Sequence, residues 1–217
     1  MKEKKELLRS MQIPLLMLSI MWIIQLIHYF FHVDFYYLGI YPLHLNGLQG
    51  IATTIFVHGS FEHLISNSIP ILLLGSALFL YYREFALKLI VYLTLLTGFY
   101  VWLMGRESWH IGASGLVYAL ASFHLVSALL RKEMRLVAFS MLVIFLYGGM
   151  IWGFFPQFFP NKNISWESHL MGAITGLVFA VHYRKIGMQR KEYFDEDDEE
   201  DDPDEDRYWE VDSNENP

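Results

Sequence analysis

The sequence predicts an all-α membrane protein, a bundle of six transmembrane helices with both termini on the cytoplasmic side. The first observation behind this fold class is composition: 54% of the 217 residues are apolar. The second is that six apolar stretches approach the roughly 20 residues that a helix needs to cross a bilayer. The third is that Lys and Arg gather at alternate connections between these stretches. The chain has no cysteine, so we expect no disulfide, thiolate nucleophile or cysteine metal site.

The predicted spans follow one another closely, apart from two longer connections. They cover approximately residues 11–31, 61–82, 85–104, 113–131, 135–155 and 168–184. The first apolar run, after the basic residues 1–10, is too long for the core of a signal peptide, so we interpret it as a span. The connection 32–60 is rich in aromatic residues, which favours a segment that rests at the membrane interface. The connection 154–167 contains Pro156 and Pro160 and should form an irregular cap.

The charges divide the chain into a body and a tail. Residues 1–191 hold 15 Lys or Arg against 8 Asp or Glu, whereas residues 192–217 hold 1 against 15. Of the 15 Lys and Arg residues in the body, 13 lie at the N-terminus, at the junctions between spans two and three and between spans four and five, or after span six. The other two are Arg106 and Lys162. This asymmetry predicts cytoplasmic termini. We therefore expect three parts: a cytoplasmic N-terminus (1–10), a six-helix domain (11–185) and an acidic, disordered cytoplasmic tail (186–217) whose partner is unknown.

Polar residues stand where three of the predicted spans begin. His63 and Asn67 lie in the first turns of span two. Ser114 begins span four within the sequence Gly-Ala-Ser-Gly, and His169 begins span six. In the predicted topology these three spans run inward from the outer side, so their polar residues should meet at one depth. Polar groups inside a membrane are costly unless they have partners, and they often mark function.

A hydroxyl and an imidazole at one depth suggest a serine nucleophile and its base. The N–H groups at the start of a helix lack intrahelical partners, so those of Ser114 and its neighbours could stabilise an oxyanion. The near-neutral pKa of an ordinary histidine suits His169 as a general base. His63 and Asn67, four residues apart, share a helix face and offer further N–H donors. Glycines that flank the serine, Gly112 among them, allow close approach of backbone or substrate.

Each of these residues also has a structural interpretation. Ser114 could be a small residue that serves helix packing, and His169 could be an interfacial histidine bonded to a carbonyl. His63 and Asn67 could bond to neighbouring helices. Gly172 and Gly176 lie on the same helix face as the histidine of span six and form a groove that lets another backbone come close.

Together the three motifs resemble those of the rhomboid intramembrane serine proteases. The residues concerned are His-Gly-Ser-Phe-Glu-His-Leu-Ile-Ser-Asn at 58–67, Gly-Ala-Ser-Gly at 112–115 and His-Leu-Met-Gly at 169–172, and the resemblance covers about residues 11–185. It implies that Ser114 is the nucleophile and His169 the base, with no acidic third member. It also implies an oxyanion site of His63, Asn67 and the Ser114 N–H, and a Tyr118 ring packed against the base.

The sequence departs from that family at two places. Many members carry Trp-Arg in the first outer connection, where this chain reads Gln49-Gly50. That pair is structural, so its absence concerns the anchoring of the loop more than the chemistry. Position 168, often alanine in the family, is Ser168.

The resemblance implies an endopeptidase that cleaves single-span transmembrane substrates near their outer end, in the lipid bilayer of a bacterial plasma membrane. A catalytically silent, rhomboid-like protein that binds membrane clients is the alternative hypothesis. A transporter is disfavoured, because no ionisable residues or paired halves stand out near mid-span. Four of the nine histidines, at 58, 63, 110 and 169, could lie on the outer side, but none forms a His-Glu-x-x-His motif. We expect no metal, no cofactor and no nucleic-acid partner.

Overall fold

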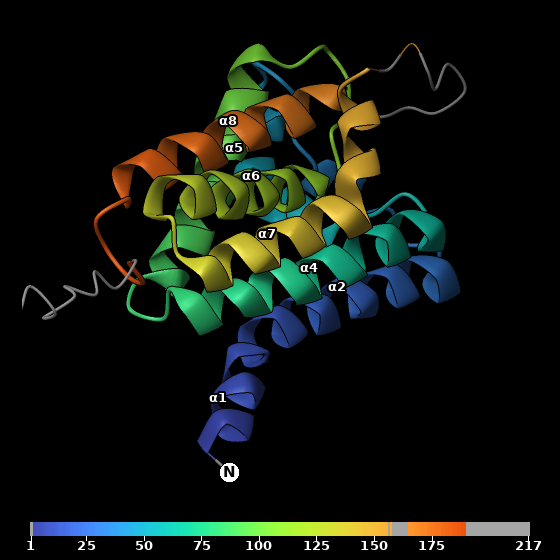
Figure 1. Ribbon diagram of the computed structural model, residues 1–217. Coiled ribbons are helices and arrows are strands. Elements are labelled where there is room, and N and C mark those ends of the chain that lie inside the picture. Colours follow the sequence, from blue (N-terminus) through green and yellow to red (C-terminus); the bar gives the residue numbers. More distant parts are fainter. Residues whose placement is uncertain (1, 156, 158–164, 190–217) are drawn as a thin grey trace, which may run out of the picture.

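The computed structural model describes residues 2–155, 157 and 165–189. The expected tail beyond residue 189 and most of the expected cap, with Pro156 and Pro160, lie outside these residues. The regular secondary structure of the described part is helical, and its residues form no named strand (Figure 1). One isolated antiparallel bridge pairs Ile40 with His110. The prediction of an all-α fold is therefore confirmed.

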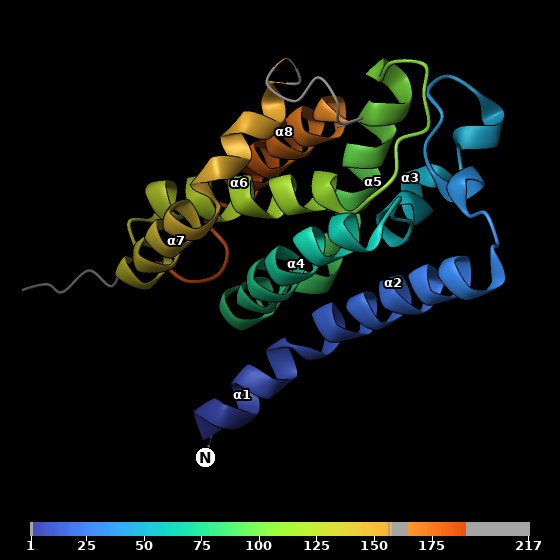
Figure 2. The same cartoon turned by 90° about the vertical axis from the view of Figure 1, so that its right-hand side faces the viewer.

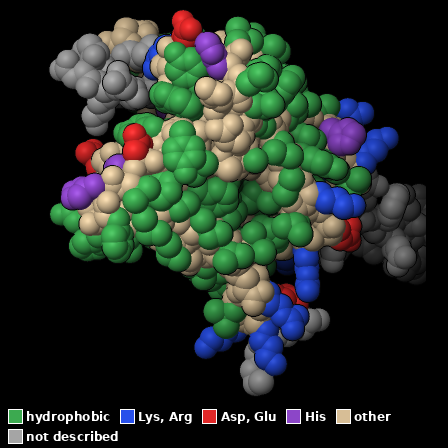
Figure 3. All heavy atoms as spheres, turned by 180° about the vertical axis from the view of Figure 1, so that it is seen from behind, with side chains coloured by type: hydrophobic (Ala, Val, Ile, Leu, Met, Phe, Trp, Pro, Cys, Tyr) green, Lys and Arg blue, Asp and Glu red, His purple; other side chains and the backbone are tan. Residues whose placement is uncertain are grey.

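Apart from the fifth, the helices follow the predicted spans to within a few residues. The long ones are α2 (Gln12–Phe31), α4 (Phe61–Tyr81), α5 (Ala86–Met104), α6 (Ser114–Arg131), α7 (Met134–Tyr147) and α8 (Trp166–His182), and a short helix α1 (Lys2–Ser10) precedes them. Among the described residues four segments are long and apolar enough to cross a membrane: Glu3–Phe31 and the helices α4, α5 and α6. Apolar side chains cover much of the face shown in Figure 3. The protein is thus an integral membrane protein; its six-span count and the side on which its termini lie stay predictions.

Helix α6 lies at the centre of the bundle. It packs against α4, α5, α7 and α8, and α2 lies outside against α4 (Figure 2). Burial agrees with this arrangement, since 67% of the apolar window of α6 is buried but only 22% of that of Glu3–Phe31. The residue that starts α6 therefore enters the middle of the protein rather than its lipid-facing surface.

The closest helix pair is α6 and α8. A Cβ at Gly172 would overlap the carbonyl oxygen of Gly115, and one at Gly176 would overlap that of Ala119. Small residues at such positions let two membrane helices touch through their backbones. Ser122 adds a hydrogen bond across the pair, from its Oγ to the Ala173 oxygen at 2.8 Å. This contact brings the beginnings of the two helices face to face.

The predicted fifth span, 135–155, differs from the helix that forms. Helix α7 ends at Tyr147, and the chain continues as a 3-10 helix, η4 (Gly148–Phe154). The change falls at Gly148, because glycine disfavours the interior of an α-helix. Helix η4 packs against α8, and its Gly153 reaches the first turn of that helix.

The connection 32–60 folds into short turns: η1 (Tyr36–Leu38), η2 (Leu45–Gly47), α3 (Gly50–Thr53) and η3 (Thr54–Phe56). The Gln49 amide joins them, because its Nε2 donates to the oxygens of Tyr37 at 2.7 Å and Asn46 at 2.6 Å. Gln49 thus ties this connection together. That the connection rests at the membrane interface stays a prediction.

Candidate active site

Ser114 is the first residue of α6, and the chain enters it through a turn that requires glycine. Gly112 has a φ of +109°, which residues with a side chain rarely adopt. Its N–H donates to the Thr54 oxygen at 3.1 Å, and the next N–H, of Ala113, donates to Nε2 of His58 at 3.4 Å. The backbone before the serine is therefore held from two sides.

His169 lies opposite, in the first turn of α8. Its Nε2 is 3.0 Å from Ser114 Oγ, and its Nδ1 is 2.8 Å from the Gly153 oxygen. A carbonyl oxygen only accepts, so Nδ1 carries the proton and donates it. In the neutral ring, Nε2 is then unprotonated and accepts the hydrogen bond of the serine hydroxyl. This is the tautomer that a base toward Ser114 requires.

Two neighbours fix the plane of the His169 ring. Tyr118, one turn along α6 from Ser114, stacks on it with centroids 4.2 Å apart and planes 9° apart. On the Nδ1 side, a Cβ at Gly153 would overlap the Tyr118 hydroxyl and lie 2.9 Å from that nitrogen, so only glycine fits there without displacing these two rings. The sequence offered no signal for Gly153, because the group that it supplies is a backbone carbonyl that any residue possesses.

His63 and Asn67 lie on α4, whose N-terminus is capped by Ser60 Oγ accepting from the His63 N–H at 3.1 Å. The His63 ring lies against the turn before the serine: a Cβ at Gly112 would be 2.6 Å from its Cε1 and 2.7 Å from its Nε2. Asn67 is buried, and its Nδ2 donates within α4 to the His63 oxygen at 3.1 Å. The structure thus brings His63 to the turn that precedes Ser114, whereas the Asn67 amide is engaged with its own helix.

His58 is a residue of this region to which the sequence assigned no role. It is buried, and its ring meets that of His63 edge to face at 5.0 Å. Burial, and secondarily the neighbouring His63, lowers the pKa of His58 from 6.5 to about 3. The ring is therefore neutral near pH 7, as it must be for Nε2 to accept the Ala113 N–H.

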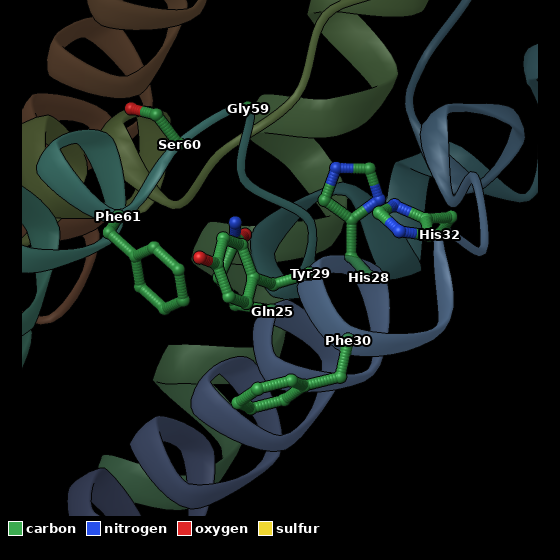
Figure 4. A pocket seen from close by; sticks show the side chains of 8 residues that line it. All are labelled: Gln25, His28, Tyr29, Phe30, His32, Gly59, Ser60 and Phe61. Carbon is green, nitrogen blue, oxygen red and sulfur yellow. The ribbon is translucent and has the colours of Figure 1, made fainter.

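A pocket of about 750 Å³ opens between the C-terminal end of α2 and the start of α4 (Figure 4). It is lined by Gln25, His28, Tyr29, Phe30, His32, Gly59, Ser60 and Phe61. Neither Ser114 nor His169 lines it. Among the described residues, no group of three or more His, Cys, Asp or Glu side chains could hold a metal ion.

The fold and this site define a membrane protein in which a serine at the start of one helix faces a histidine at the start of another. The family model of the rhomboid domain matches residues 45–186, and the chain belongs to the rhomboid family. Uncharacterized proteins of Mycobacterium bovis and Mycobacterium tuberculosis are each 33% identical over 148 residues, 65% of this chain and 62% of theirs. Rhomboid-related protein 1 of Caenorhabditis elegans is 32% identical over 133 residues, 57% of this chain and 36% of its own. The match thus spans less than two thirds of these relatives.

Proposed function

We propose that this protein is an intramembrane serine endopeptidase that cleaves the transmembrane segment of a substrate near its outer end. The observation that carries the proposal is the 3.0 Å contact between Ser114 Oγ and His169 Nε2, with the opposite ring nitrogen bonded to the Gly153 oxygen. A nucleophile within hydrogen-bond reach of a base, which a third group orients, is the arrangement that covalent catalysis needs.

In the proposed reaction Ser114 Oγ attacks the scissile carbonyl carbon while His169 Nε2 takes the hydroxyl proton. The oxyanion that forms accepts hydrogen bonds from the Ser114 N–H, and His63 and Asn67 supply further donors after Asn67 leaves its bond to the His63 oxygen. Gly112 leaves room beside the oxyanion. The imidazolium then protonates the leaving amine, and water hydrolyses the acyl-enzyme with His169 as base again.

The remaining residues support these two. Tyr118 holds the face of the imidazole, while Gly172 and Gly176 hold α8 against α6. The proposed protein crosses a bacterial plasma membrane six times over residues 11–185, with residues 1–10 and the acidic stretch 186–217 on the cytoplasmic side. Its proposed substrates are single-span membrane proteins, and the reaction needs no cofactor.

The test compares wild type with Ser114→Ala and His169→Ala in liposomes that contain a single-span substrate. We expect cleavage by wild type and a loss of at least about 10³-fold in each variant. Ser122→Ala is the matched control, because it removes a hydroxyl from the same helix, one that bonds to α8 rather than to the base. A fluorophosphonate probe should label wild type and Ser122→Ala, and should not label Ser114→Ala.

Equal cleavage by all four proteins would show that the roles given to Ser114 and His169 are wrong. If folded wild type neither cleaves any of several substrates nor reacts with the probe, the result supports a catalytically silent protein that binds membrane clients.

A further inference from the structure

A buried ion pair joins the connection before α6 to the first turn of α8. Glu167 is only 4% exposed, and its Oε1 lies 3.4 Å from a guanidinium nitrogen of Arg106, whose side chain is 44% exposed. Neither carboxylate oxygen accepts a hydrogen bond from the described residues. Removing a carboxylate from water costs several kcal/mol, and an ion pair at this distance recovers only part of it. Because the ion pair adds so little stability, a functional role explains the burial of Glu167 better than a structural one does.

A chain of hydrogen bonds runs beside the ion pair. His110 Nε2 lies 2.9 Å from the Arg106 oxygen, so it carries the proton and donates it. His110 Nδ1 therefore accepts from the Ser165 hydroxyl at 2.6 Å, and Ser165 Oγ in turn accepts from the Ser168 hydroxyl at 2.6 Å. Burial lowers the pKa of His110, and this effect exceeds the opposite effect of the negative charge of Glu167. The ring therefore stays in the neutral form that this chain of hydrogen bonds needs.

The His110 backbone extends the network to the connection 32–60. His110 and Ile40 exchange hydrogen bonds of 2.8 and 2.9 Å, and Thr54 Oγ1 donates to the His110 oxygen at 2.7 Å. Four residues after His110 the chain reaches Ser114. On the other side, Ser165 and Glu167 lie four and two residues before His169. The network therefore attaches the segment that leads to the nucleophile to the turn that carries the base, although the two lie 55 residues apart in the chain.

We propose that Glu167, together with Arg106 and His110, positions His169 relative to Ser114. This inference rests on the proposed peptidase activity. The contacts at Gly172 and Gly176 set how closely α8 approaches α6. The polar network fixes the position of the first turn of α8, which carries His169. A misplacement of about 1 Å between reacting groups costs on the order of 10²-fold in rate. A network that contributes little to stability can therefore have a large effect on the rate of the reaction.

Glu167→Gln is the principal test, because it keeps the shape of the side chain and removes its charge. We expect kcat in liposomes to fall about 10- to 100-fold with KM within about twofold, since the reacting geometry changes and the substrate-binding surface does not. The rate of fluorophosphonate labelling at Ser114 should fall in parallel. Arg106→Gln should have a similar effect, and Arg106→Lys, which keeps the cation, should restore most of the activity. The effects of the two glutamine variants should not add in the double variant.

Glu107→Gln is the matched control. This neighbouring carboxylate has a side chain that is 74% exposed and lies 3.4 Å from His44, so its loss should leave kcat and labelling unchanged. Unchanged kcat in folded Glu167→Gln, or a change in KM alone, would overturn the positioning role.

If Glu167→Gln does not fold, Ser165→Ala tests the same network by cutting the hydrogen-bond chain and leaving the ion pair intact. It should lower kcat several-fold, and an unchanged kcat would count against the proposal. A wild type that neither cleaves nor labels would overturn the proposed function and this role with it, whereas an active wild type beside an equally active Glu167→Gln would overturn this role alone.

Discussion

Gly112→Ala tests the turn that places His63 beside Ser114. At a φ of +109° an alanine is strained whatever the space around it, and its Cβ would lie 2.6 Å from Cε1 and 2.7 Å from Nε2 of the His63 ring. Ordinary van der Waals contact of a Cβ starts near 3.4 Å. The ring must therefore retreat by about 0.8 Å, or the turn must change its course.

The strain in φ and the clash with the His63 ring are separate effects, so their costs add. An unfavourable φ costs about 1–3 kcal/mol, and forcing an extra methyl into a packed site costs about 1–3 kcal/mol. We expect a loss of about 2–6 kcal/mol in unfolding free energy. If the displaced ring is an oxyanion donor, kcat should also fall about 10²- to 10³-fold.

Thermal unfolding in detergent and fluorophosphonate labelling measure the two effects. Gly149→Ala is the control, because a Cβ there meets no atom within 4 Å and its φ is unremarkable; both readouts should stay near wild type. In Gly112→Ala/His63→Ala the clash disappears but the strain in φ does not, so stability should recover in part while labelling stays slow. A Gly112→Ala protein as stable and as reactive as Gly149→Ala would refute this reasoning.

Three further outcomes follow from the geometry. Because the pKa of His58 is about 3 in the folded protein against 6.5 in the unfolded chain, its contribution to stability is complete above about pH 6.5 and decreases as the pH falls; it should be smaller by about 2 kcal/mol at pH 5. His58→Gln should flatten the thermal stability profile over that range, and an unaltered profile would contradict this. Gly172→Val should force α8 away from Gly115 and slow the labelling of Ser114 at least about 10²-fold; labelling at the wild-type rate would show that the pair tolerates separation. Gln49→Leu removes two hydrogen bonds at an exposed site, so it should cost about 1 kcal/mol and speed proteolysis within residues 32–60 without changing the labelling rate.

The sequence was sufficient to predict the main helices, and for a physical reason. A helix that crosses a membrane needs a long apolar run, and such runs stand out from the polar connections on either side. The contact of Ser114 with His169 was also predictable, because the predicted topology starts alternate spans on the same side and each residue opens such a span. The glycines of span six indicated that another backbone would approach, and Gly115 and Ala119 are the residues that do so.

Other parts of the site depend on groups that leave no trace in a sequence. The Gly153 oxygen that bonds His169 belongs to the backbone, and its position depends on α7 giving way to a 3-10 helix seven residues long. Glu167 in the first turn of a helix is an ordinary complement to the helix dipole, so its pairing with Arg106 was not foreseeable. The two bonds of Gln49 likewise depend on the fold of a connection with no periodic pattern.

The replacement of an acidic partner by the Gly153 carbonyl has a consequence for the proposed mechanism. A carboxylate beside the base would orient the ring and also stabilise the imidazolium, but a charge at membrane depth costs about 2.5–3.5 kcal/mol on insertion scales. A carbonyl avoids that cost and still fixes the tautomer, because it can only accept the Nδ1 proton. It stabilises the positive ring less than a full charge would, so correct placement of His169 has to provide more of the rate. The stacked Tyr118, the glycine contacts of α8 and the network around Glu167 all act on placement, which is why substitutions there should lower kcat rather than raise KM.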